Sequence, residues 1–190
     1  ARQGVNRQAV GQLRIHRLRV TDYVVGFPPI AGPDARVPIL GAAPGVLSLS
    51  AGQYYANPRN AFWRSRTRVL DGPGDLSYET REQMRLTARI PLWDVLAEGD
   101  RPGSLDSCIV AATAVVSALA AFVAGHPHIP SVCFNGRTAQ ALWDRHVACR
   151  QRLPANVAFA TLPSTSAANT RITFVEKTDA WQASLLGGTM

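Results

Sequence analysis

Residues 37–45 read Val-Pro-Ile-Leu-Gly-Ala-Ala-Pro-Gly, a short apolar run followed by a loop that two glycines and a proline shape. An apolar run of this length that ends at glycine is typical of a buried strand. The loop 41–45 carries no bulky side chain, so it can bring backbone close to a ligand. Further strands are predicted at 91–94, 130–134 and 157–162.

Helices are predicted between and after these strands. They cover residues 60–69, 77–89, 104–124, 138–152 and 174–185, and a long loop at 41–58 and a polar loop ending at Gly103 separate them from the strands. Alternation of strand, helix and strand predicts a mainly parallel sheet that is covered on both faces. The sequence therefore indicates one α/β domain with a four-stranded sheet.

Composition excludes several classes of protein. Of the 190 residues, 46% are hydrophobic and 17% are charged, which is an ordinary globular balance and argues against disorder. Three cysteines do not make a disulfide framework, and their spacing is not that of a metal site. The chain opens without a signal peptide, and its longest apolar run, 109–123, is too short to span a bilayer. We therefore expect a cytoplasmic monomer that uses no metal, cofactor or membrane.

Positive charge is concentrated near the N-terminus. Up to Arg68 there are ten arginines and two acidic residues, whereas the rest of the chain carries a net charge of −1. Such asymmetry favours a polyanionic partner, although basic residues often form only a solvated face. We expect residues 1–20 to be a basic arm or an added edge segment, and residues 21–190 to form the single domain.

Polar side chains follow the predicted strands at their carboxyl ends, where ligands bind in open parallel sheets. Asn135 offers a carboxamide that can both donate and accept, as the edge of a base requires. The loop 163–166 offers hydroxyls and N–H groups that suit phosphate, and Tyr54 and Tyr55 offer rings for stacking. Together these groups predict a pocket for a planar heterocycle beside a phosphate-binding loop.

Several motifs, in order along the chain, resemble the uracil-DNA glycosylase superfamily. The most similar branch is that of the hypoxanthine-DNA (deoxyinosine) glycosylases, sometimes called family six. The resemblance extends from about Gly26 to Trp181. It is carried by Gly41–Gly45 with Gly52–Trp63, Leu92–Leu96, Gly103–Ser107, Phe134–Gly136, and Leu162–Ser166 with Asn169.

This resemblance implies a three-layer α/β/α sandwich and an enzyme that flips a deaminated base, hypoxanthine or uracil, out of DNA and hydrolyses its N-glycosidic bond. By motif position, Asn60 is the catalytic residue that orients water and stabilises charge at the sugar. The implied base-binding residues are Gly41, Ala43, Gly45, Tyr55 and Asn135. The implied DNA-binding residues are Arg59, Ser164, Thr165, Ser166 and Asn169.

Structural alternatives stand beside these roles. Asn60 could simply bond backbone at a helix start, Asn135 could cap a turn, and Asp94 is expected to accept hydrogen bonds from loop N–H groups. Ala42 and Ala43 stand where many relatives have Asn or Asp, which keeps open a catalytically weakened nucleic-acid-binding relative. A mismatch-specific uracil-DNA glycosylase is the rival enzyme. An unrelated α/β hydrolase is disfavoured because the chain has no Gly-x-Ser-x-Gly elbow.

Overall fold

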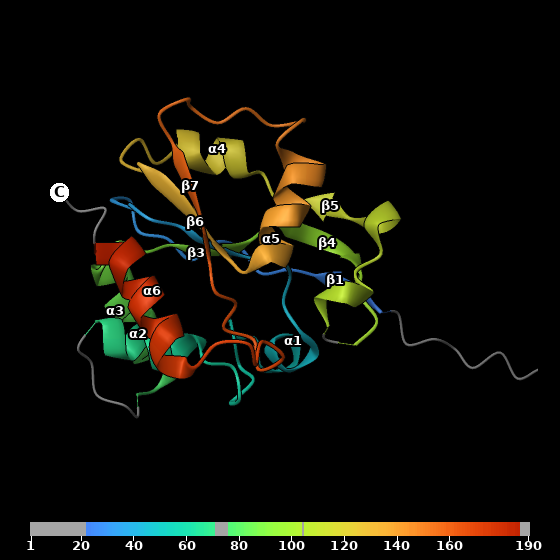
Figure 1. Ribbon diagram of the computed structural model, residues 1–190. Coiled ribbons are helices and arrows are strands. Elements are labelled where there is room, and N and C mark those ends of the chain that lie inside the picture. Colours follow the sequence, from blue (N-terminus) through green and yellow to red (C-terminus); the bar gives the residue numbers. More distant parts are fainter. Residues whose placement is uncertain (1–21, 71–75, 104, 187–190) are drawn as a thin grey trace, which may run out of the picture.

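The computed structural model describes residues 22–70, 76–103 and 105–186, so the predicted arm at 1–20 lies outside the described residues. A four-stranded sheet runs through the centre of the molecule, and its neighbouring strands are all parallel (Figure 1). This confirms the predicted fold class. In sheet order the strands are β3 (Leu92–Asp94), β2 (Ile39–Gly41), β6 (Ser131–Asn135) and β7 (Ala158–Leu162).

The register of the sheet brings the predicted polar positions to one edge. Gly41 pairs with Asp94 across β2 and β3, and Leu40 pairs with Phe134 across β2 and β6. Asn135 in turn pairs with Leu162. Because parallel strands end on the same side, Gly41, Asp94 and Asn135 lie together at the carboxyl edge.

Helices cover both faces of this sheet. Successive side chains of each strand point to opposite sides, so both faces carry apolar residues that the helices bury. Ile39 packs in the core on one face and Leu40 in the core on the other. The first face carries α2 (Phe62–Val69), α3 (Tyr78–Thr87) and α6 (Phe174–Leu186), and the second carries α4 (Leu119–Ala124) and α5 (Arg137–Leu142) (Figure 1). The molecule is therefore a three-layer α/β/α sandwich.

A small antiparallel sheet beside this sandwich was not predicted. It consists of β1 (Tyr23–Val25), β4 (Leu96–Asp100) and β5 (Val115–Val116), in the order β1-β4-β5. The prediction of a polar loop after Asp94 is wrong because that segment is the central strand of this sheet.

The predicted helix at 104–124 is also wrong. Two 3₁₀ turns, Asp106–Cys108 and Ala111–Thr113, lead into β5, and only Leu119–Ala124 forms an α-helix. The strand β4 needs a partner for its backbone groups, and the β-branched pair Val115–Val116 supplies it. The pairing overrides an alanine-rich run that favours a helix by propensity alone.

Two further boundaries differ from the prediction. The segment 41–58, predicted as a loop, contains α1 (Val46–Ala51), which ends at Gly52 in the left-handed conformation, with φ 62°. The helix predicted at 138–152 ends earlier, because α5 passes into a π-helical turn at Trp143–Val147. Beyond it the Gln151 side chain bonds the backbone at the start of α4, which draws the chain away from the helix axis.

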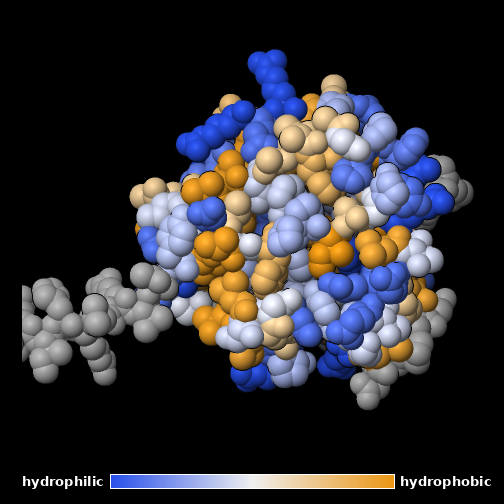
Figure 2. Space-filling view, turned by 180° about the vertical axis from the view of Figure 1, so that it is seen from behind, coloured by the Kyte–Doolittle hydropathy of each residue, from blue (hydrophilic) through white to orange (hydrophobic). Residues whose placement is uncertain are grey.

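The surface is mixed in character. On the face opposite to that of Figure 1, hydrophobic residues form separate groups between hydrophilic ones (Figure 2). Within residues 22–70, 76–103 and 105–186, no helix has the length and apolar character that a membrane span requires.

Candidate active site

A hydrogen-bond network at the carboxyl edge of the sheet is centred on Asn135. Its Nδ2 donates to the Tyr55 hydroxyl and to Thr165 Oγ1, both at 2.9 Å, and its Oδ1 accepts from the Thr165 N–H at 2.9 Å. The amide thus fixes the loop after β7 against the tyrosine of the first motif. Both its N–H bonds are used in this way, so in this structure Asn135 positions its neighbours instead of capping a turn.

Gly41 makes close packing possible at the same edge. A methyl group at Gly41 would overlap Asp94 Oδ1 and would lie 3.0 Å from the Tyr55 hydroxyl. The absence of a side chain therefore lets a carboxylate and a phenol approach the end of β2 together.

Asp94 is buried at this position, with 3% of its surface exposed. The prediction that it accepts from loop N–H groups is wrong, because the nearby Val95 and Leu96 N–H groups donate instead to the carbonyls of Gly41 and Ala42. Burial raises the pKa of the Asp94 carboxyl from its ordinary value of 3.8 to about 7, although Arg101 acts to lower that pKa.

Tyr55 occupies a strained and well-supported position. Its φ of 54° is uncommon for a bulky residue, and its ring stacks on Phe62 with 3.9 Å between ring centroids. Burial raises the pKa of its hydroxyl above the ordinary range, so the phenol is protonated at neutral pH. One ring face is thus taken by Phe62, and base stacking would have to use the other.

Asn60 lines a cleft beside this network. The cleft has a volume of about 240 Å³, and its walls include Tyr55, Asn57 and Arg64. Asn60 Oδ1 accepts from the Phe62 N–H at 2.9 Å, as expected for a residue at a helix start. Within the described residues Asn60 Nδ2 makes no hydrogen bond, so it is available to a ligand or to water.

The backbone joins Asn60 to the loop after β7. The N–H of Ala61 donates to the carbonyl of Thr165 at 2.9 Å, and Thr165 is the residue that Asn135 holds. Asn135 thus bonds Tyr55 and Thr165 directly. Asn60 is connected to Thr165 only through the backbone of its neighbour Ala61, and it makes no hydrogen bond with Asn135.

The loop 163–169 is held by its own side chains, by Asn135 and by helix α6. Ser164 Oγ accepts from the Ser166 N–H, and Asn169 Nδ2 donates to the Ser164 carbonyl at 3.0 Å. Helix α6 anchors the loop, because Lys177 Nζ donates to the Asn169 carbonyl at 2.6 Å and Trp181 Nε1 to the Pro163 carbonyl at 2.9 Å. A hydroxyl that accepts from backbone still has its own hydrogen to donate, so these serines remain able to bind phosphate.

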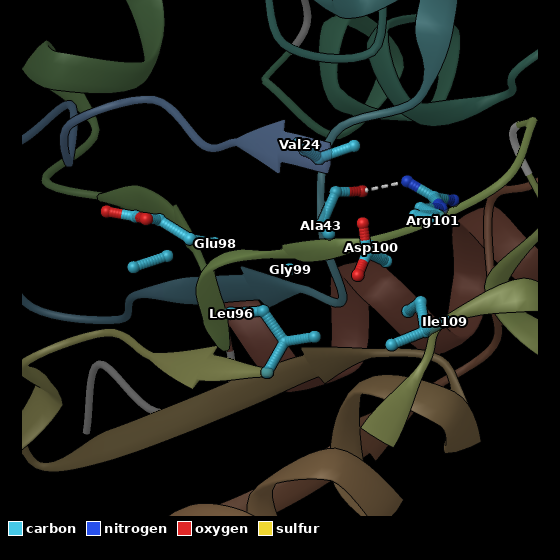
Figure 3. A pocket seen from close by; sticks show the side chains of 9 residues that line it. Val24, Ala43, Leu96, Glu98, Gly99, Asp100, Arg101 and Ile109 are labelled. Atoms are coloured by element: carbon cyan, nitrogen blue, oxygen red, sulfur yellow. Dashed lines mark hydrogen bonds between the residues drawn. The ribbon is translucent and has the colours of Figure 1, made fainter. Parts of the chain in front are cut away.

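The first loop is supported from behind by Arg101. This guanidinium, 6% exposed, donates to the carbonyl of Ala43 at 2.7 Å (Figure 3). It also donates to the carbonyl of Pro44 at 2.6 Å and to Asp106 Oδ1 at 2.6 Å. Ala42 packs in the core, while Gly45 stands at the N-cap of α1. The cavity behind Ala43, also lined by Val24, Leu96 and Ile109, measures about 10 Å³, which is room for one water and not for a base.

Removing this support should destabilise the protein and impair whatever the first loop binds. Arg101→Met would leave two buried carbonyls and Asp106 without their donor, so we expect the free energy of unfolding to fall by about 2 kcal/mol. Chemical denaturation measures this change. The matched control is Arg89→Gln, since the Arg89–Asp34 ion pair is half exposed and should contribute less than about 1 kcal/mol. Equal losses for the two variants would contradict the assigned role of Arg101.

The arginines between positions 59 and 68 do not share one environment. Arg59, Arg64 and Arg68 are exposed, and the Arg64 guanidinium lies 4.6 Å from the centroid of the Phe174 ring. Arg66 is 2% exposed and points into the core, so it is excluded from phosphate contact.

Arg101 and Lys177 were missed by sequence reasoning. No local pattern marks a charged residue whose partners are backbone carbonyls far away in the chain. Within the described ranges, no group of three or more His, Cys, Asp or Glu side chains could hold a metal ion.

Known proteins resemble the chain in both sequence and structure, although no protein-family model matches it. A hypoxanthine DNA glycosylase of Methanosarcina acetivorans is 32% identical over 161 residues, which cover 83% of this chain and 95% of that protein. One of Methanosarcina barkeri is 32% identical over 117 residues, covering 59% and 70% respectively. An NMR structure of a candidate uracil DNA glycosylase from M. acetivorans matches with a TM-score of 0.72 and 30% identity, over 86% of this chain and 96% of that one.

The three-layer fold, the edge formed by Gly41, Asn135 and Thr165, and the solved relative together define a protein of the uracil-DNA glycosylase superfamily. Within this superfamily, the chain belongs to the hypoxanthine DNA glycosylases.

Proposed function

We propose that the protein is a monofunctional DNA glycosylase that removes a deaminated base, hypoxanthine or uracil, in base excision repair. The observation that carries the proposal is the linkage of three motif segments: Asn135 bonds both Tyr55 and Thr165, and the Thr165 carbonyl bonds the backbone beside Asn60. This linkage joins the cleft lined by Asn60 and Tyr55 to the serine-rich loop that contains Thr165.

In the proposed reaction, Asn60 acts on the attacking water. An amide is too weak a base to remove a proton early, but Nδ2 can hold the water and the amide dipole can stabilise a cationic sugar. That is sufficient when cleavage is largely dissociative, with the leaving base departing as an anion. The capping bond from the Phe62 N–H fixes the amide and so keeps its reorganisation small during the reaction.

The leaving base needs a donor for its developing charge. The Tyr55 hydroxyl accepts a hydrogen bond from Asn135 Nδ2. The hydrogen of the Tyr55 hydroxyl therefore points away from Asn135. The backbone N–H groups and hydroxyls of the loop 163–166 are suited to the phosphates on either side of the flipped nucleotide.

Strand scission tests the function directly. Labelled duplexes and single strands carrying one hypoxanthine or one uracil are incubated with the protein and then treated with alkali, which breaks the strand at abasic sites. Cleavage of hypoxanthine DNA supports the proposal, and cleavage of uracil opposite guanine alone would indicate a mismatch-specific uracil enzyme. Binding without scission of any substrate would indicate the weakened relative.

Salt dependence should report the exposed arginines. If Arg59 neutralises a phosphate, Arg59→Gln should reduce the slope of log affinity against log salt by about 0.9. Fluorescence anisotropy with a short duplex measures this slope. Arg152→Gln is the matched control, because Arg152 is also exposed but precedes β7, toward the amino ends of the strands. If both variants changed this slope equally, DNA affinity would depend on the overall charge of the protein and not on a phosphate contact of Arg59.

A further inference from the structure

Asp94 is buried without a structural partner. Its Oδ2 is enclosed and makes no hydrogen bond among the described residues, and Oδ1 lies over Gly41 beside the Tyr55 hydroxyl. A buried carboxylate with an unsatisfied oxygen lowers the stability of the folded protein. A group held at such a cost, at the edge where this sheet binds ligands, suggests that its partner arrives with the ligand.

Asp94 and Tyr55 form an ordered pair of hydrogen-bonding groups. The Tyr55 hydroxyl receives a hydrogen from Asn135, so its own hydrogen must point elsewhere and can be donated. An ionised carboxylate only accepts. The two groups meet at Gly41. Tyr55, but not Asp94, is among the residues that line the cleft containing Asn60, so the pair connects to the proposed base site through Tyr55.

Deamination creates the complementary pattern on a base. It converts an amidine edge, with a ring nitrogen acceptor and an amino donor, into a lactam edge, with a ring N–H donor and a carbonyl acceptor. We propose that Asp94 and Tyr55 together recognise this lactam edge, with the Asp94 carboxylate accepting from the ring N–H and the Tyr55 hydroxyl donating to the adjacent carbonyl. This inference rests on the proposed function and identifies the residues that set its substrate class.

Discrimination should depend on the ionisation of Asp94. The charged groups around it are Arg101, which lowers its pKa, and Asp106, which raises it, while the phenols of Tyr54 and Tyr55 are neutral. Since burial brings the pKa to about 7, the acceptor-only form dominates above pH 7. Below pH 7 the protonated carboxyl can also donate, so it tolerates the reversed edge of adenine.

The test is binding to single-stranded oligonucleotides with one hypoxanthine or one adenine on a 2′-fluoro sugar that resists cleavage. In the wild type we expect at least tenfold preference for hypoxanthine at pH 8 and a smaller preference at pH 6. In Asp94→Asn the preference should be lower at pH 8 and equal at the two pH values, because an amide has no proton to gain. An unchanged preference and pH dependence in Asp94→Asn would overturn the inference.

Stability separates this role from a structural one. The folded pKa of Asp94 is raised above 3.8, so the wild type should lose more stability than Asp94→Asn as the pH rises from about 4 to 7. Asp94→Asn should therefore be the more stable protein at pH 8, and a lower melting temperature for it would overturn the inference. Strand scission by the wild type is measured separately. If the wild type binds hypoxanthine selectively but cleaves no substrate, the proposed function is wrong and the inference on recognition by Asp94 and Tyr55 stands.

Discussion

Replacing Asn60 by alanine should lower single-turnover cleavage of the preferred lesion about a hundredfold, the usual effect of losing one positioned polar group in an active site. The variant removes a side-chain amide that lines the cleft and whose hydrogen-bond donor is unused within the described residues. DNA binding should persist because the exposed arginines are untouched. Rates measured with enzyme in excess over DNA report the chemical step.

A second variant separates catalysis from helix capping. Loss of the cap alone should cost about 1 kcal/mol of stability. Asn60→Ser retains an oxygen that can accept from the Phe62 N–H but has no Nδ2. We expect Asn60→Ser to be nearly as stable as the wild type and nearly as slow as Asn60→Ala. Wild-type cleavage by either variant would remove Asn60 from the mechanism.

The central sheet could be predicted because its signals are local. Each buried strand is a short apolar run that ends at a glycine or a polar residue, as at Leu40 and Phe134. Parallel strands end on the same side, so the positions of Gly41, Asp94 and Asn135 at one edge also followed from the sequence pattern.

The elements that were missed depend on distant partners. The run 109–123 is apolar without a helical period, and its outcome was decided by the free backbone groups of β4. Similarly, Arg101 acts on carbonyls 57 and 58 positions away, and Asn135 acts on Thr165 30 positions away. An Asn-Gly pair indicates a turn in the sequence, but nothing in it indicates which loop the amide will hold.

The resemblance to family six identified the family correctly, but it did not reveal how the first loop is supported. Ala42 and Ala43 stand where many relatives have Asn or Asp. In the structure, Ala42 packs in the core and Ala43 faces a cavity with room for one water. The catalytic polarity that relatives place in this loop therefore has to come from other segments, which directs attention to Asn60 and Asp94.

Hypoxanthine opposite thymine or guanine, or in single-stranded DNA, should be removed at least ten times faster than hypoxanthine opposite cytosine. Extruding a nucleotide from a stable pair costs a few kcal/mol, and about 1.4 kcal/mol corresponds to a tenfold change. A large side chain inserted into the duplex would offset this cost, but the loop 165–169 carries only small side chains and the buried Thr165. Tyr54 is not available for insertion either, because it is 3% exposed and packs against Phe27.

The measurement compares single-turnover rates for hypoxanthine opposite each base in one sequence context. If uracil is a substrate, the same comparison is made between uracil opposite guanine and uracil opposite adenine. Equal rates for stable and unstable pairs would contradict passive extrusion and require a wedge from another segment. The exposed apolar side chains of Val46 and Leu47, which follow the first loop directly, would then be the ones to replace. If Leu47→Ala made the rates diverge, the wedge would lie at the start of α1, and the small residues of the loop after β7 would serve phosphate contact alone.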